Sequence, residues 1–182
     1  MGERILGVDP GLETTGYGLI ETAGRQVRHL AGGIVVTRAD APLTQRLSAL
    51  HARMAQLLEE LKPRIVVLEE LYAHYQHPMT AILMGHARGV ITLAVAQRDI
   101  QLVCYLPTRV KKAITGHGHA TKTQVQGMVT SLLGLPSRPE PDDVSDALAL
   151  ALTYARTLDR PALAAVVKAR RRLPSALQEV FR

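Results

Sequence analysis

The segment RILGVD at residues 4–9 predicts the first strand of a sheet, because it is short and apolar, ends in a carboxylate and runs into a tight turn at Pro10 and Gly11. Residues 16–22 and 27–37 have the same strand character and follow after short connections. Connections this short join antiparallel neighbours, since parallel strands need a long crossover. The first forty residues therefore predict a three-stranded antiparallel meander.

Beyond the meander, strands and helices alternate. The pattern predicts a helix over 42–61, a nearly all-apolar strand over 64–69, a helix over 78–97 and a strand over 101–106. An all-apolar strand is typical of a central parallel position covered on both faces. Further helices are expected at 107–114, 121–133 and 142–158. The predicted fold class is α/β: a five-stranded mixed sheet, three antiparallel strands and then parallel strands, flanked by helices.

Composition and charge divide the chain into two parts. Of 182 residues, 47% are hydrophobic and 21% are charged, which is typical of a globular domain, here residues 1–158. The net charge is +6, and residues 160–182 alone carry six basic side chains against one acidic. We expect 159–182 to be a basic C-terminal extension, either a short helix or a disordered segment. Such an extension suits an anionic partner, although solvated charged ends are common.

The sequence also gives expectations about location. No run of 18 to 20 apolar residues suggests a membrane span, and the N-terminus enters a strand directly without a signal peptide. Cys104 is the only cysteine, so an internal disulfide is impossible, and its apolar neighbours favour an inert position in a buried strand. We expect a cytoplasmic protein without a membrane partner.

Four carboxylates stand out by their positions. Asp9 and Glu69 end two apolar strands, while Asp143 and Asp146 lie three residues apart at the start of the last helix and so share a face. Hard divalent cations such as Mg²⁺ prefer oxygen ligands of this kind. A pair of such ions is a common device for cutting phosphodiester bonds.

Each position has a plainer interpretation. The segment from residue 7 to residue 18 could be an ordinary hairpin turn, or the phosphate-cradling turn of an actin-like ATPase. Glu69 could be a solvated strand end, with Glu70 on the opposite face. Asp143 and Asp146 could complement the helix dipole, although Asp142 is available for capping and two facing acids repel without a cation between them.

The combination of motifs resembles the RuvC family of Holliday-junction resolvases, within the ribonuclease-H-like nuclease superfamily. The resemblance runs from about residue 4 to about residue 156. It rests on GVDPG at 7–11 with TGYG at 15–18, LEE at 68–70, GHARGV at 85–90, VKK at 110–112 with GHG at 116–118, KTQV at 122–125 and DVSDALA at 143–149.

The resemblance implies a structure-specific DNA endonuclease that resolves four-way junctions by paired symmetric nicks in recombination and repair. It places the metal-binding and catalytic acids at Asp9, Glu69, Asp143 and Asp146, around two Mg²⁺ ions for which Mn²⁺ could substitute. Lys111 and Lys122 match basic residues beside the active site, with roles in catalysis and DNA binding. We expect further DNA contacts from Lys112, His117 and His119, although such lysines and loop histidines are often only solvated.

Three further expectations follow from the resemblance. Tyr72 matches an aromatic residue that stacks on bases at the junction crossover; otherwise it is a half-buried loop side chain. The helix that carries Gly85 and Gly89 would form a homodimer interface, unless the close approach that these glycines imply occurs within the domain. A branch-migration motor would be a partner.

Two other functions stay open on the sequence. One is a different ribonuclease-H-like nuclease, such as an enzyme that trims RNA ends. The other is a junction-binding module that does not cleave. An actin-like ATPase becomes remote, because it would need a second phosphate loop and a second domain.

Overall fold

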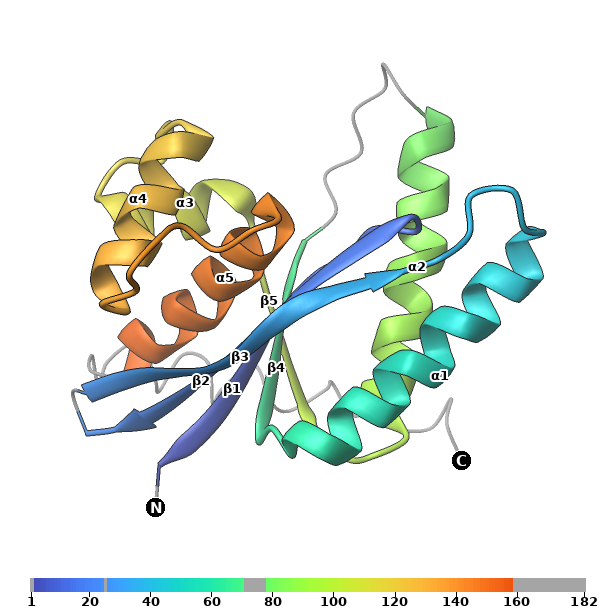
Figure 1. The fold of residues 1–182 in the computed structure, drawn as a ribbon, viewed down its shortest axis with the longest axis horizontal. Coiled ribbons are helices and arrows are strands. Elements are labelled where there is room, and N and C mark those ends of the chain that lie inside the picture. Colours follow the sequence, from blue (N-terminus) through green and yellow to red (C-terminus); the bar gives the residue numbers. More distant parts are fainter. Residues whose placement is uncertain (1, 25, 71–77, 159–182) are drawn as a thin grey trace, which may run out of the picture.

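A five-stranded sheet forms the centre of the molecule, with strand order β3-β2-β1-β4-β5 (Figure 1). The computed structural model describes residues 2–24, 26–70 and 78–158. Within them the elements are β1 (Glu3–Asp9), β2 (Thr14–Ala23), β3 (Gln26–Val36), α1 (Leu43–Leu61), β4 (Ile65–Glu69), α2 (Pro78–Ala96), β5 (Gln101–Tyr105), α3 (Pro107–Thr115), α4 (Lys122–Leu132) and α5 (Asp142–Leu158). Every predicted element is present, with boundaries within two residues of those expected.

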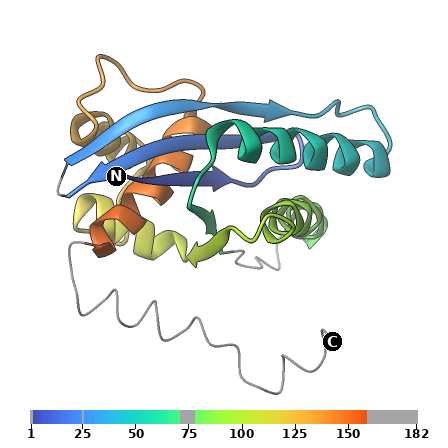
Figure 2. The ribbon, with the colours of Figure 1, turned by 90° about the horizontal axis from the view of Figure 1, so that it is seen from below.

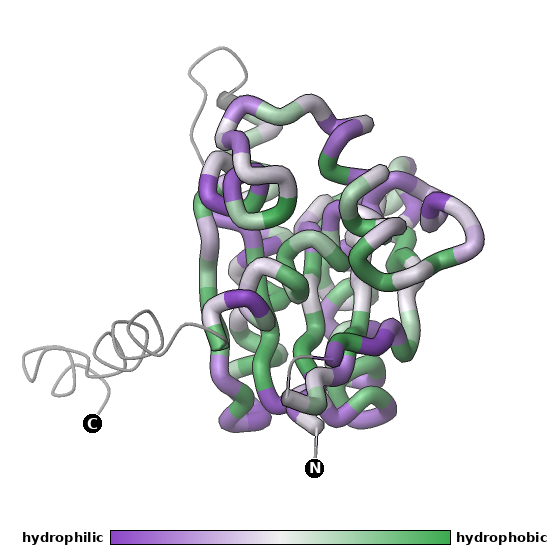
Figure 3. Tube along the Cα trace, turned by 90° about the vertical axis from the view of Figure 1, so that its left-hand side faces the viewer, coloured by the Kyte–Doolittle hydropathy of each residue, from purple (hydrophilic) through white to green (hydrophobic). Residues whose placement is uncertain are grey.

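The sheet is mixed, as the sequence predicts. β1 pairs antiparallel with β2, and β2 with β3, whereas β4 runs parallel to both β1 and β5. Helices α3, α4 and α5 cover one face, and α1 and α2 cover the other (Figures 1 and 2). Figure 3 shows hydrophobic stretches along the strands, with hydrophilic residues at the connections and also within the helices.

The strands place alternate residues in two separate cores. Ile65 and Val67 join the core beneath α5, while Val66 and Leu68 join the core beneath α1 and α2. The same alternation puts Ile5 in the α5-side core and Leu6 in the other. Because side chains alternate along a strand, Asp9 and Glu69 share the α5 face.

Helix α5 lies directly on the backbone of β1 and β2. A Cβ atom added to Gly7 would collide with the backbone of Ala147, and one added to Gly16 would collide with the backbone of Asp143. Glycine is therefore required for this close approach. The two glycines set the distance between the sheet and the helix that carries two of the four acids.

Helix α2 and strand β5 each bear on an expectation from the sequence, and the buried position expected for Cys104 is wrong. By length and composition α2 could cross a membrane over Met79–Ala96, and 22% of that segment is buried, but the segment contains His86 and Arg88 and is not an unbroken apolar run. Helix α2 nevertheless packs Ala87 and Ile91 into the sheet core, as a helix of this domain. Cys104 is only partly buried, and its Sγ accepts a hydrogen bond of 3.0 Å from Arg88.

Candidate active site

The four candidate carboxylates come from three elements that meet at one end of the sheet. Asp9 ends β1 and Glu69 ends β4, and these adjacent parallel strands finish at the same edge. Asp143 and Asp146 lie in the first turns of α5, which packs across β1 and β2. The structure thus brings together all four residues that the sequence singles out.

The start of α5 is held by the connection that precedes it. Arg138 donates a hydrogen bond of 3.3 Å to the buried Gln126 of α4, and Ser145 donates one of 3.3 Å to the carbonyl of Pro139. These contacts tie residues 134–141, the connection between the two helices, to both α4 and α5. They fix where α5 begins and therefore where its acids lie.

The electrostatics of the acids show how closely they interact. Burial, followed by the negative charges of Asp146, Glu69 and Asp143, raises the pKa of Asp9 to about 7. Burial is also the main cause that raises the pKa of Glu69, with the charge of Asp146 adding to it. Burial raises the pKa of Asp146 as well, against the opposing effect of Lys122. A partly buried cluster of this kind favours a bound cation.

Lys111 and Lys122, the two lysines expected beside the active site, lie next to these acids. A hollow of about 230 Å³ is lined by Glu69 and Asp146 together with Lys111 and Lys122. The positive charge of Lys111 lowers the pKa of Glu69. The Nζ atom of Lys122 lies 3.0 Å from Asp146 Oδ2, which makes it a direct partner of a candidate metal ligand.

Other expected contact residues lie away from this hollow. Lys112 is exposed on α3, and His119 is exposed in the loop before α4. His117 lines a different hollow with Thr115, Gln124 and Met128. Tyr72 and the basic extension 159–182 lie outside the described residues.

The donor chemistry fits Mg²⁺, which prefers carboxylate oxygens and retains several waters. Among the described residues, no three acidic, histidine or cysteine side chains already converge as a ligand set. Glu69 and Asp146 line the hollow, Asp9 interacts electrostatically with the other three acids, and Asp146 is paired with Lys122.

One more acid belongs to the site and was not expected there. Asp142 Oδ2 lies 3.4 Å from Lys122 Nζ, so the lysine bridges Asp142 and Asp146. The two acids are four residues apart on α5 and therefore share a face. That spacing is visible in the sequence, but the sequence does not show that α4 brings a lysine to it.

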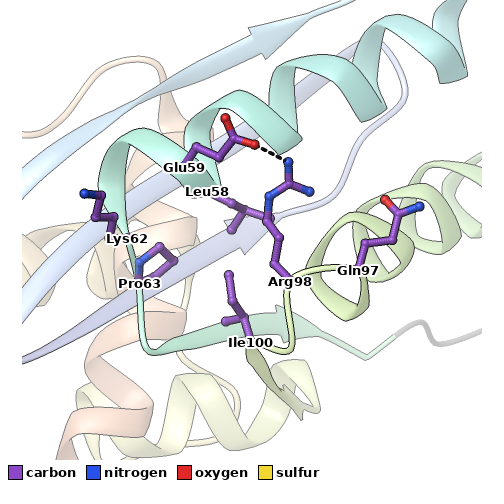
Figure 4. A pocket seen from close by; sticks show the side chains of 7 residues that line it. All are labelled: Leu58, Glu59, Lys62, Pro63, Gln97, Arg98 and Ile100. Atoms are coloured by element: carbon purple, nitrogen blue, oxygen red, sulfur yellow. Dashed lines mark hydrogen bonds and ion pairs between the residues drawn. The ribbon is translucent and has the colours of Figure 1, made fainter.

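A second hollow, of about 720 Å³, lies at the opposite end of the sheet (Figure 4). Its lining comes from the end of α1 and from residues 97–100 after α2. Figure 4 shows Arg98 reaching toward Glu59, at 2.8 Å. The acid in this hollow is therefore already paired, and no second acid lines it, so it lacks the features of a metal site.

The cluster predicts how the stability of the metal-free protein depends on pH. Asp9 has a pKa of about 7 when folded, against 3.8 as the ordinary value, so between these pH values the folded state holds a proton that the unfolded state has lost. Folding stability should therefore fall as pH rises from about 4 to about 7, by up to about 4 kcal/mol.

The decrease in folding stability can be measured by urea unfolding in the presence of a chelator, repeated at several pH values between about 4 and about 7. Asp9→Asn removes the titrating group and should flatten the curve. An equally steep fall in Asp9→Asn would show that Asp9 is not its source.

The sequence of the chain is similar to those of one protein family. A family model described as Crossover junction endodeoxyribonuclease RuvC matches residues 5–154. The crossover junction endodeoxyribonuclease RuvC of Thermomicrobium roseum is 47% identical over 151 residues, which cover 83% of this chain and 91% of that protein. The one of Rhodopirellula baltica is 45% identical over 148 residues, covering 81% and 83%.

Solved structures give the same result. Thermus thermophilus RuvC in complex with a Holliday junction substrate superposes with a TM-score of 0.79 at 35% identity, covering 86% of this chain and 97% of that one. The yeast mitochondrial Holliday junction resolvase Ydc2, at 12% identity and a TM-score of 0.62, shares the fold. The chain belongs to the RuvC family of crossover junction endodeoxyribonucleases.

Proposed function

We propose that this protein is a Mg²⁺-dependent endonuclease that resolves four-way DNA junctions by paired symmetric nicks, in recombination and repair. The observation that supports the proposal is that Asp9, Glu69, Asp143 and Asp146 lie at one edge of the sheet, close enough for the other three acids to raise the pKa of Asp9. The relative from Thermus thermophilus, whose structure contains a Holliday junction, supports the choice of substrate.

The chain's own residues have distinct tasks in this mechanism. The four carboxylates would hold two Mg²⁺ ions, with Mn²⁺ as a substitute. Two ions held by these carboxylates would supply an activated water and charge stabilisation for the departing 3′-oxygen, and the products would be a 5′-phosphate and a 3′-hydroxyl. Lys111 lines the same hollow and would contact the scissile phosphate.

We also propose how DNA is held around the site. Lys111, Lys112 and Lys122 would contact phosphates, with His117 and His119 in the adjoining loop. The extension 159–182 would add further contacts, since residues 160–182 hold six basic side chains and one acidic. A branch-migration motor as partner and a cytoplasmic location complete the proposal, both inferred from the family resemblance.

Tyr72 is proposed to stack on bases at the crossover. If its ring does so, Tyr72→Ala should slow cutting of an intact junction about 5- to 150-fold, corresponding to about 1–3 kcal/mol of stacking. Tyr72→Phe should be tolerated, because the ring face is retained. Single-turnover cleavage measures both effects.

A junction with unpaired bases at its centre provides the control for Tyr72. It should largely rescue Tyr72→Ala, because the cost of opening base pairs has already been met. Equal slowing on the paired and unpaired junctions would instead assign Tyr72 a structural role.

We propose that the protein acts as a homodimer through α2. One stripe along this helix is exposed and largely apolar, with spacings that alternate between three and four residues: Met79, Ile82, His86, Gly89, Leu93 and Ala96. A Cβ atom added to Gly89 would meet nothing within 4 Å, so among the described residues no other element packs against it. A helix apolar on both its inner and outer sides is expected to be covered on both.

The stripe gives a direct test of dimerisation. Ile82 and Leu93 are 53% and 51% exposed, and the double change to glutamate should weaken the dimer at least about tenfold, because charges would be buried at its centre. Sedimentation equilibrium measures the change. Val36→Glu, at an apolar side chain 62% exposed on β3, is the matched control and should leave the dimer intact.

One assay tests the proposed function. Labelled four-way junctions, linear duplexes and single-stranded RNA would each be incubated with the protein, with and without Mg²⁺. We expect nicks in two opposing strands of the junction only when the metal is present. Cutting of RNA ends would favour a different ribonuclease-H-like nuclease, and binding without cutting would favour a junction-binding module.

A further inference from the structure

Lys122 occupies an unfavourable local position. It is the first residue of α4, directly after the N-cap residue Thr121. A reciprocal pair of hydrogen bonds between Thr121 and Gln124 fixes this helix start. A cation at the N-terminus of a helix opposes the helix dipole, typically at a cost of about 0.3–1 kcal/mol. Another interaction must therefore compensate for placing a lysine there.

The compensation comes from α5. Lys122 Nζ lies 3.0 Å from Asp146 and 3.4 Å from Asp142. Asp146 is one of the four acids proposed to hold metal, whereas Asp142 is outside that set. The side chain of Asp142 is 57% exposed and that of Asp146 is 30% exposed, so the lysine spans from the solvent-facing edge of α5 to the hollow.

The pairing also affects the rest of the acidic cluster. The charge of Lys122 lowers the pKa of Asp9, against the three acids that raise it. Lys111 lowers the pKa of Glu69 in the same way, but among the described residues it is Lys122 that lies within ion-pair distance of an acid of the cluster. Among the described residues, Lys122 is therefore the cation that directly contacts the acidic cluster.

We propose that Lys122 is the built-in counter-ion of the acidic cluster, that it must leave Asp146 for a divalent cation to bind there, and that Asp142 is a positioning residue that retains it afterwards. This inference rests on the proposed function, in which Asp146 is a metal ligand. It explains why an acid outside the ligand set lies one helical turn before Asp146. It also gives Lys122 a task before any DNA is bound.

The inference can be tested without DNA and without catalysis. Mn²⁺ is titrated into the intact protein, and its binding is followed by the loss of the free-ion electron paramagnetic resonance signal. Removing the competing ammonium in Lys122→Gln should tighten Mn²⁺ binding about two- to fivefold, which is what one partly exposed ion pair is worth. Lys62→Gln removes the same charge from an exposed site at the end of α1 and should change binding less than twofold.

A double-mutant cycle isolates the role of Asp142. Asp142→Asn should weaken Mn²⁺ binding in the wild-type background, because the displaced lysine then has no second partner. In the Lys122→Gln background the effect of Asp142→Asn should shrink by at least half. Equal effects in both backgrounds would overturn the role of Asp142 as a holder of the lysine.

The remaining outcomes separate this inference from the function on which it rests. Unchanged or weaker Mn²⁺ binding by Lys122→Gln, with normal binding by the wild type, would overturn the counter-ion role and leave the proposed nuclease intact. No saturable Mn²⁺ binding by the wild type would overturn both.

Discussion

Asp9→Asn is expected to slow junction cleavage by roughly 10³-fold or more while leaving junction binding nearly unchanged. The substitution keeps the shape of the side chain and removes the charge of a metal ligand, and metal-ion stabilisation of the transition state is worth several kcal/mol. Asp9 should be the most sensitive of the four, because Asp146, Glu69 and Asp143 all act on it. Binding should survive, since it rests on phosphate contacts elsewhere.

The other acids should give the same result as Glu69→Gln, Asp143→Asn and Asp146→Asn. Single-turnover cleavage at saturating protein reports the chemistry, and a gel-shift assay in a chelator reports binding. Glu70→Gln is the matched control, because Glu70 directly follows Glu69 but lies beyond the end of β4. Near-normal nicking by any of the four variants would remove that residue from the site.

The strand pattern predicts that the carboxylates lie at strand ends and that Glu69 and Glu70 point to opposite faces of the sheet. The structure adds which face Glu69 takes, because Val67 lies in the core beneath α5 and Leu68 in the other core. The same reasoning holds for Asp9 at the end of β1. Local periodicity carries this information because the side-chain direction in a strand repeats every two residues.

Features that depend on how elements approach one another were not predictable in this way. In the sequence, the glycines near Asp9 indicate a tight turn. The structure shows that Gly16, by lacking a side chain, also allows α5 to pack closely against β2. The pairing of Lys122 with Asp142 requires α4 to lie beside the start of α5, which no local pattern reveals. The roles of Tyr72 and of residues 159–182 remain predictions.

The close packing of α5 on β2 leads to a prediction about Gly16, a residue that has no side chain. A Cβ atom added to Gly16 would lie 2.8 Å from the Cβ of Asp143 and closer still to its carbonyl group. Real Cβ atoms essentially never come this close, so α5 would have to move away from β2. Because backbone rather than a flexible side chain opposes the added carbon, the start of the helix would move and carry Asp143 with it.

Gly16→Ala is therefore expected to cost about 1–3 kcal/mol of stability, as overpacking typically does. It should also slow cleavage about 100-fold, because a displacement of about 1 Å at a reacting centre can have that effect. Chemical denaturation and single-turnover cleavage, at a temperature where the variant is fully folded, measure the two effects separately.

Gly127→Ala is the control for this prediction, because a Cβ atom there would meet nothing within 4 Å in the middle of α4. It should stabilise the protein by up to about 1 kcal/mol and leave cleavage unchanged. If Gly16 acts by positioning Asp143, the Gly16→Ala variant should also bind Mn²⁺ more weakly, and higher metal concentration should recover part of its rate. Loss of stability with an unchanged metal dependence would mean that Gly16 serves the fold alone.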